Sequence, residues 1–459
     1  MEKIQEILTI NNKFNDIYNS NINIINSRSS DFVNSVRKKA FEKFKKLGIP
    51  VYKTEDYKYT NLLSKFSFDY KHALCPQNIE IELNEVFKCE VPELDTHLII
   101  FINGWYYDKN STHNNLPKGV LAGSFAKYSK EYPEIIKKHF SKYAKSDKDG
   151  LIALNTAFTQ DGFFLYIPKG VVVEKPIQVI NILLSDCDLM AFQRNLIIAE
   201  ENSEVKIISC DHTLSPERFL TNSVTEIYSD KNSHIEYYNI QNEHNASAKI
   251  NSTFVHQKNN SSVTTNTITL HGGLIRNNIN VLLNGENCES NTYGIYLIDK
   301  NQHLDNFTFI DHAKPNCYSN ELFKGVLDDF ATGVFTGKIL VRNGSQKTNA
   351  YQSNNNILLT DDAQMNSKPQ LEIYADDVKC SHGTTVGRLD ENALFYLRAR
   401  GISEKEAKLL LMYAFAHEII DKIKVEPLKN QINELVEKRF RGELSKCNNC
   451  VFNCSELKK

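Results

Sequence analysis

A thiol and an imidazole lie two residues apart in the segment Tyr374–Thr385, at Cys380 and His382. In an extended strand, side chains with this spacing point to the same side. Thiolate sulfur and imidazole nitrogen are suitable ligands for iron or zinc, but two ligands do not complete a site, so the other donors would have to come from a partner or from another strand. The spacing alone favours the alternative, which is a buried cysteine beside a hydrogen-bonded histidine.

A second group of thiols lies near the C-terminus, at Cys447, Cys450 and Cys454. This C-x₂-C-x₃-C pattern is one thiol short of the four that a closed zinc or iron–sulfur site needs. The fourth ligand could come from a partner, another copy of the chain or a solvent species. A disordered, reactive tail that binds no metal explains the pattern equally well.

The motifs of nucleotide chemistry are incomplete in this sequence. The segment Gly333–Ile339 has three residues between its glycines where a phosphate-binding loop has four, and Ile339 stands where a Ser or Thr would bind Mg²⁺. We interpret this segment as a β-turn and predict that the chain binds no nucleotide. No G-x-S-x-G or H-E-x-x-H pattern occurs either.

The composition excludes several classes of partner. Lys and Arg number 54 against 56 Asp and Glu, so the net charge of −2 argues against nucleic acid and against an anionic membrane surface. No apolar run reaches the length of about 18 residues that a membrane span needs. The first residues include Glu2 and Glu6 and resemble no leader peptide, and the ten cysteines occur mostly singly, so we expect free thiols in the cytoplasm.

Helical periodicity dominates the first part of the chain. Phe32, Val36, Ala40 and Phe44 recur at four-residue steps, and Gly48 with Pro50 ends the pattern. A strand is predicted at 97–104 and a further helix at about 124–139. We therefore expect an α-rich domain with a short strand over residues 1–150.

Short β-rich runs fill the next two hundred residues, and no helix-length periodicity interrupts them. The pattern fits a large barrel, stacked sandwiches or a β-solenoid, and we favour the solenoid for a core at residues 151–388. Asparagine recurs at 277–278 and 354–356, where it could form ladders at solenoid corners, although a compositional bias would produce the same signal.

Helices return at residues 389–446, followed by a tail at 447–459. Asp390 is a suitable N-cap for a helix that ends at Gly401, and Ser403 with Glu406 forms a capping box for the next helix. Pro427 breaks that helix, and a last one ends near Gly442.

The middle helix of this region has an unusually wide apolar stripe. Its predicted buried face consists of Ala407, Leu410, Leu411, Ala414, Phe415 and Ile419. Leu409, Met412 and Tyr413 widen the stripe beyond one side, so a partner could cover them. The alternative is a helical bundle that packs on itself.

Several of these segments closely resemble the SufB/SufD family of the SUF iron–sulfur cluster assembly system. The resemblance covers about residues 30–425 and rests on Pro369–Gly383, Gly387–Glu391, Leu394–Ile402, Thr54–Thr60, Leu154–Phe158 and Tyr166–Gly170. The family usually has Trp in place of Tyr57. SufB-type members carry a cysteine within the segment that corresponds to 351–356 and a glutamate at position 382, so the sequence is more similar to the SufD type.

The resemblance implies a right-handed parallel β-helix between helical N- and C-terminal domains. It also implies a complex with SufB and two copies of the ATPase SufC, which binds the C-terminal helices and hydrolyses the ATP. The chain itself would be a scaffold rather than an enzyme. A nascent iron–sulfur cluster, shared with SufB, would form near their interface, with His382 as a candidate ligand and Cys380 as a weaker one. The resemblance assigns no role to the tail cysteines and leaves open whether the isolated chain pairs with itself.

Two other functions remain as alternatives. The chain could be a purely structural adaptor that binds SufB and SufC but never touches the cluster. It could also be a β-helix carbohydrate-active enzyme, with Asp328–Asp329 or Asp361–Asp362 as acid and base. The single tryptophan, Trp105, disfavours this second alternative, because sugar-binding sites usually need stacking aromatics.

Overall fold

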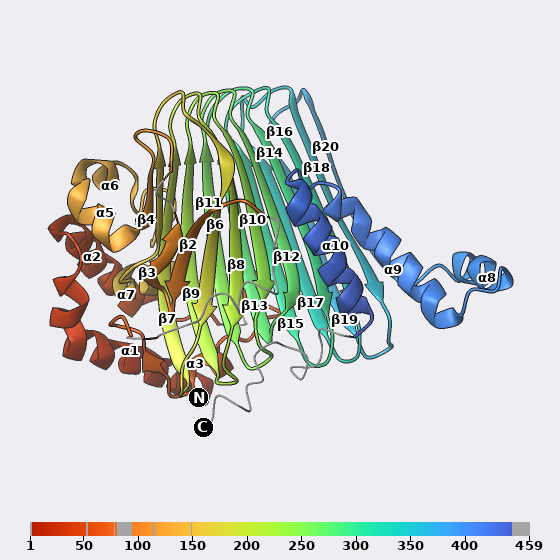
Figure 1. The fold of residues 1–459 in the computed structure, drawn as a ribbon, viewed down its shortest axis with the longest axis horizontal. Helices are drawn as coiled ribbons and strands as arrows, with labels where there is room; N and C mark the ends of the chain where they lie inside the picture. Colours follow the sequence, from red (N-terminus) through yellow and green to blue (C-terminus); the bar gives the residue numbers. More distant parts are fainter. Residues whose placement is uncertain are drawn as a thin grey trace.

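The core of the protein is a parallel β-solenoid, in which successive coils add strands alternately to two sheets (Figure 1). The computed structural model describes residues 2–51, 54–77, 79, 94–112, 115–147 and 149–442. The predicted fold class, a mainly β core with helical regions before and after it, is confirmed. Of the three β architectures considered, the solenoid is the one that forms.

The odd-numbered strands from β5 to β19 form one sheet, here called the odd sheet, and the even-numbered strands from β6 to β20 form the even sheet. Neighbouring strands within this range are parallel and paired largely in register. The odd strands are β5 Phe163–Ile167, β7 Leu189–Ala199, β9 Phe219–Ser229, β11 Ala248–Gln257, β13 Leu274–Leu283, β15 His303–His312, β17 Thr332–Val341 and β19 Gln364–Ile373. The even strands are β6 Val172–Leu183, β8 Glu204–Thr213, β10 His234–Asn242, β12 Ser262–His271, β14 Glu289–Ile298, β16 Tyr318–Leu327, β18 Thr348–Leu358 and β20 Val378–Gly387.

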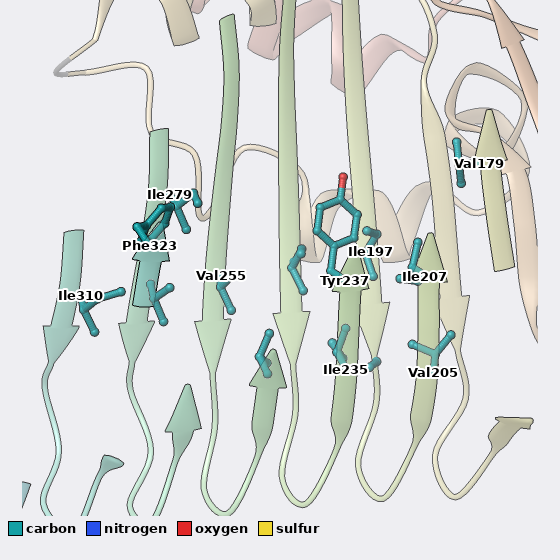
Figure 2. Packing of buried hydrophobic residues seen from close by; sticks show 14 of the residues in the cluster. Val179, Ile197, Val205, Ile207, Ile235, Tyr237, Val255, Ile279, Ile310 and Phe323 are labelled. Carbon is teal, nitrogen blue, oxygen red and sulfur yellow. The ribbon is translucent and has the colours of Figure 1, made fainter. Parts of the chain in front are cut away.

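Alternate side chains of each strand point between the two sheets and form the solenoid interior. Figure 2 shows Ile197 and Val255 from the odd sheet and Val205 and Ile235 from the even sheet in this interior. Branched aliphatic residues suit such a position because they pack well on a pleated surface. The interior apolar cluster stabilises the coils by removing these side chains from water.

An asparagine ladder lies at one corner of the solenoid. Asn202, Asn232, Asn260 and Asn287 each adopt a positive φ between 55° and 59°, a conformation that asparagine tolerates better than most residues. Each side-chain amide of the last three donates to the asparagine one coil earlier, over 2.9–3.0 Å. The ladder was expected at 277–278 and 354–356, and that placement is wrong, because those asparagines lie within β13 and β18.

Helices and short strands of the first 160 residues cover the first end of the solenoid (Figure 1). All nine residues of α7 are buried, and α7 packs between α2 and strands β7 and β9. The helix predicted from the four-residue steps is confirmed as α2, which ends at Gly48 with φ 64°. The elements are α1 Glu2–Ser27, α2 Asp31–Leu47, η1 Glu55–Tyr57, α3 Leu63–Phe66, β1 Lys71–His72, β2 His97–Ile102, β3 Trp105–Thr112, β4 Leu121–Ser124, α5 Phe125–Glu131, α6 Pro133–His139 and α7 Gly150–Phe158.

The single helix predicted at about 124–139 is wrong, because two short helices, α5 and α6, occupy this segment. Tyr132 separates them with φ −128° and ψ 58°. The ring of Pro133 clashes with a helical conformation of the preceding residue, so a proline here ends one helix and begins the next.

The C-terminal helices are α8 Glu391–Ala399, α9 Glu404–Ile420 and α10 Glu426–Phe440. The predicted caps are confirmed: the Asp390 carboxylate accepts from two backbone N–H groups, the Ser403 hydroxyl accepts from Glu406 N, and Gly401 has φ 86°. Pro427 does not end α9 but lies in the first turn of α10. At this position its missing N–H costs nothing, because the first N–H groups of a helix have no partner within the helix. Helices α9 and α10 pack on the outer face of the even sheet (Figure 1).

The predicted buried face of α9 is partly wrong. Ala407 and Ile419 are buried as expected, but Leu410 is 48% exposed and Ala414 is also exposed. Met412, expected on the exposed side, is 6% exposed and belongs to the apolar cluster between α9, α10 and the even sheet. The apolar residues of α9 itself lie on nearly all sides of the helix. Periodicity therefore could not identify the side that packs on the sheet.

The segment Gly333–Ile339, interpreted as a β-turn, is part of strand β17. Gly333 and Gly337 both face the interior, where a Cβ atom would overlap the side chains of Met365 and Gln352 respectively. The glycines therefore provide space for interior side chains rather than a turn. In the described part of the chain, no helix is long and apolar enough to cross a membrane.

Candidate functional site at the open end of the solenoid

The last coil of the solenoid, which contains β19 and β20, is open. Within the described residues, β19 pairs only with β17 and β20 only with β18, so each has one edge without a strand neighbour. None of the ten residues of β20 is fully buried, in contrast to the strands of the early coils. Unpaired strand edges can form hydrogen bonds with another chain.

Cys380 and His382 both lie in β20, so the segment is extended and the two side chains share one side of the strand. Cys380 pairs with Ala350 of β18, and His382 pairs with Gln352. The Cys380 side chain is half-buried and packs against the interior apolar cluster, and burial raises the pKa of its thiol. His382 is exposed, so its imidazole is the more accessible of the two potential ligands.

These two residues do not form a complete metal site within the described residues, where no group of three His, Cys, Asp or Glu side chains is close enough to hold a metal ion. The tail residues Cys447, Cys450 and Cys454 lie outside the described residues. Any metal bound at His382 would therefore need donors from beyond the described part of this chain.

A polar group lies in the interior directly behind His382. Thr308 Oγ1 donates to Glu321 Oε2 over 2.6 Å, and Gln352 Nε2 donates to Glu321 Oε1 over 3.2 Å. Burial raises the pKa of the Glu321 carboxyl to about 7, and no cation contributes to lowering it. A carboxyl group with these surroundings exchanges its proton near neutral pH.

Apolar side chains are exposed around the open end. They include Tyr351 of β18, Ile373 and Tyr374 at the end of β19, and Val386 of β20. Tyr351 also contacts the ring of Tyr318 one coil earlier. Exposed apolar groups gathered at an open edge are characteristic of a surface that another protein covers.

A second exposed surface lies on α8 and the adjoining half of α9. No residue of α8 is buried, Phe395 is 73% exposed, and Tyr396 is also exposed. Figure 1 shows that α8 lies beyond the last strand, away from the solenoid. Leu410 on α9 is exposed as well.

The three residues predicted to bind a partner differ in exposure. Leu409 is half-buried and packs against the cluster beneath α9, and Tyr413 is half-buried and donates from its hydroxyl to Asn433 over 3.1 Å. Met412 is buried in this chain, so its expected exposure is wrong. Leu409 and Tyr413 keep one accessible side each.

The carboxylates considered for a carbohydrate enzyme lie in corner turns. Asp329 has φ 51° and is exposed, and Asp361 is exposed and forms an ion pair with Arg388. Asp329 Oδ2 accepts from Lys300 N, and Thr360 Oγ1 donates to the Asp329 carbonyl oxygen. These contacts assign the carboxylates to the turns.

Sequence reasoning missed Glu321 and Gln352, because they are 31 residues apart and no local pattern joins them. The coil length of about 30 residues was the signal that could have placed them in neighbouring strands. It also missed the exposed aromatics of α8, since one turn of helix with two aromatic residues fits a packed helix equally well.

Comparison with known families gives two matches that together span most of the chain. Residues 182–415 match the family described as SUF system FeS cluster assembly, SufBD core domain. Residues 8–179 match the SufBD protein N-terminal region.

Individual proteins show the same similarity. An iron–sulfur cluster assembly SufBD family protein of Synechocystis is 29% identical over 403 residues, which are 86% of this chain and 88% of that protein. The iron–sulfur cluster assembly protein SufD of Escherichia coli is 31% identical over 293 residues, or 63% of this chain and 69% of that protein. SufD of Bacillus subtilis is 29% identical over 331 residues, or 71% of this chain and 75% of that protein.

Proposed function

The chain belongs to the SufBD family of the SUF iron–sulfur cluster assembly system, and from this premise we propose that it is the SufD-like scaffold subunit of a complex with SufB and the ATPase SufC. The observation that carries the proposal is the open end of the solenoid, where two strand edges without a neighbour among the described residues, exposed apolar side chains and the accessible imidazole of His382 occur together. Nascent clusters are the cargo of this complex, and the chain catalyses no reaction of its own.

SufB binds to the open end. Its strands continue the two sheets by pairing with the free edges of β19 and β20, and its side chains cover Tyr374 and Val386. An interface that continues both sheets satisfies the exposed backbone groups and the exposed apolar surface at the same time.

The cluster forms at this junction, with His382 as a ligand. One nitrogen of a neutral imidazole binds iron, and the remaining ligands come from SufB. Cys380 is the weaker candidate, because its thiol is half-buried and burial favours the protonated form, which does not bind metal.

SufC binds to α8 and the exposed side of α9. Phe395, Tyr396 and Leu410 supply exposed apolar contacts, and Leu409 and Tyr413 supply their accessible sides. Because α8 lies beyond the solenoid, movement of SufC during ATP hydrolysis could be transmitted through α9 to the open end (Figure 1).

We place the complex in the cytoplasm. Cys288 and Cys317 are free thiols that precede the paired strands β14 and β16 and lie in neighbouring coils. Two thiols in adjacent coils that remain free fit a reducing compartment, in which disulfides rarely form.

The test is anaerobic reconstitution of the complex of this chain, SufB and SufC with iron and sulfide. His382→Ala should leave the melting temperature and the complex intact while cluster formation slows at least about tenfold, since a ligand is lost. His234→Ala is the matched control, because His234 is also exposed but begins β10 in an earlier coil. Cluster formation at the parental rate by the His382 variant contradicts the ligand role.

The structural adaptor is the second candidate function, since His382 alone is an incomplete site within the described residues. It predicts parental cluster formation in His382→Ala, in Cys380→Ser and in a variant with Ser at Cys447, Cys450 and Cys454. Slow cluster formation in the triple variant alone would assign the ligands to the tail instead.

A further inference from the structure

Four residues form a column in the even sheet that ends at His382. Thr292 pairs with Glu321, Glu321 with Gln352, and Gln352 with His382, each in the next coil. In-register neighbours of a parallel sheet are about 4.8 Å apart and their side chains point to the same side. The first three residues are buried, and His382 is the exposed end of the column.

The contacts of Glu321 determine the orientation of the Gln352 amide. Gln352 Nε2 donates to Glu321 Oε1 over 3.2 Å, so the nitrogen end of the amide is turned toward the carboxyl group. Thr308 Oγ1 donates to the other carboxylate oxygen from the opposite sheet. Gln352 Oε1 therefore points away from the carboxylate.

The opposing odd strand leaves space for this amide at Gly337. A Cβ atom at this position would overlap the Cδ, Nε2 and Oε1 atoms of Gln352. Gly337 pairs with Thr308, so the residue that binds Glu321 and the residue that accommodates Gln352 are neighbours in the same sheet. The interior is shaped around the Gln352 side chain.

Gln352 Oε1 has no hydrogen-bond donor among the described residues. The residue is 3% exposed, and Oε1 accepts no hydrogen bond within the described part of the chain. A buried carbonyl oxygen without a donor is costly and is uncommon in folded proteins. The neighbour of Gln352 at the open end of the column is His382, whose exposed imidazole carries an N–H and can rotate.

We propose that Gln352 is a positioning residue for His382: its Oε1 accepts one ring N–H of the imidazole and directs the other ring nitrogen outward to the iron. This inference rests on the proposed function for the role of that outward nitrogen, but the hydrogen bond needs no partner chain, because it forms when the exposed His382 ring turns toward the Oε1 that has no donor in the structure. Ligating histidines generally donate their second N–H to such an acceptor, which selects the tautomer and orients the ring.

The first test measures the tautomer of His382 in the free, full-length chain. Histidine is labelled with ¹⁵N, the signals of His382 are assigned by their loss in His382→Ala, and the tautomer ratio of the neutral ring is read from the two nitrogen shifts. Gln352→Met keeps the length of the side chain and removes the acceptor. It should change the ratio about tenfold, the equivalent of one hydrogen bond.

Gln241→Met is the matched control. Gln241 is buried in the interior and makes hydrogen bonds to Thr269 and Asn277, but it lies in the early coil of β10. It should reduce stability at least as much as Gln352→Met and leave the His382 tautomer ratio unchanged. An unchanged ratio in Gln352→Met overturns the inference, and so does an equal change in both variants.

A second variant covers the case in which Gln352→Met does not fold. Glu321→Gln keeps the volume but replaces the carboxylate with an amide that can also donate, so the Gln352 amide loses its preferred orientation. The His382 tautomer ratio should shift in the same direction by a smaller factor, and no shift overturns the inference.

Cluster formation in the complex with SufB and SufC separates this inference from the proposed function. Gln352→Met should slow cluster formation several-fold in an intact complex, and Gln241→Met should not. If His382→Ala forms clusters at the parental rate, the proposed function fails, whereas the tautomer measurement still decides whether Gln352 holds the imidazole. Parental cluster formation by Gln352→Met with a shifted tautomer also overturns the positioning role.

Discussion

The two ends of the solenoid are built from the same kind of parallel coils, but they differ in what covers them. At the first end, helices α2 and α7 pack on the initial strands, and all eleven residues of β9 are buried. At the last end, no residue of β20 is fully buried, and β19 and β20 each keep a free edge within the described residues. Within the part of the chain that the structure describes, helices cover the first coils and the last coil is left uncovered.

The buried charges differ in the same way. Arg194 and Glu226, both fully buried near the first end, form a 2.6 Å ion pair, and the Glu226 carboxylate also accepts from three backbone N–H groups of residues 141–144. Among the described residues, the hydrogen-bond donors to Glu321, near the open end, are the neutral side chains of Thr308 and Gln352. The first end is built for stability, whereas the open end retains a carboxyl group that can change its protonation state.

The largest expected effect comes from breaking the ion pair of the first end. Arg194→Leu leaves Glu226 buried without its cation, which should reduce the free energy of unfolding by about 3–5 kcal/mol, measured by urea denaturation. Arg388→Leu is the control at the open end, where the exposed pair with Asp361 should contribute less than about 1 kcal/mol. Equal losses in the two variants would contradict the contrast between the ends.

The second prediction concerns the pH dependence of stability due to Glu321. Burial raises its pKa in the folded chain to about 7, from an ordinary value of 4.5. Between these values the folded chain keeps the proton and the unfolded chain has lost it, so the free energy of unfolding falls as pH rises, by up to about 3 kcal/mol. Glu321→Gln should not show this fall.

Urea denaturation of both chains at several pH values checks this prediction. Other groups titrate in the same interval, but they contribute equally to the two chains, so the difference between their unfolding free energies isolates Glu321. A difference that does not vary with pH would mean that Glu321 is ionised throughout.

The third prediction tests whether the open end is an interface. Val386 in β20 is 45% exposed, and Val172 in β6 of the first coils is 48% exposed, so a charge at either position should hardly affect folding. Val386→Glu should weaken association with SufB by about 2 kcal/mol, which isothermal calorimetry would detect, whereas Val172→Glu should not. Equal affinities of the two variants for SufB would place the interface elsewhere.

Local patterns in the sequence predicted the fold class and the helix ends that carry caps, at Gly48, Asp390, Gly401 and Ser403. The caps at Asp390 and Ser403 were recognisable because each is a short-range interaction between neighbouring residues. The break at Tyr132 was also encoded locally, by Pro133, and was overlooked. The resemblance to a known family, rather than the β-rich runs themselves, identified the architecture most specifically.

The candidate site could be predicted only in part, because it depends on contacts between coils. The spacing of Cys380 and His382 indicated a shared side if the segment is extended, but it did not indicate that Cys380 packs on the interior apolar cluster while His382 is exposed. Gly337 was predicted to lie in a turn, but it lies in β17 and leaves space for the Gln352 side chain opposite it. The packed side of α9 depends on the shape of the even sheet, which periodicity does not report.

The last prediction extends the comparison to the helices beyond the open end. Leu410→Glu replaces an exposed side chain of α9 and should weaken SufC binding by about 1–2 kcal/mol without a change in melting temperature. Met412→Glu, two residues away, should instead lower the melting temperature, because it buries a charge against the even sheet. Calorimetry with SufC and thermal unfolding of both variants distinguish the two effects, and full SufC binding by a folded Leu410→Glu chain would exclude this side of α9 from the docking surface.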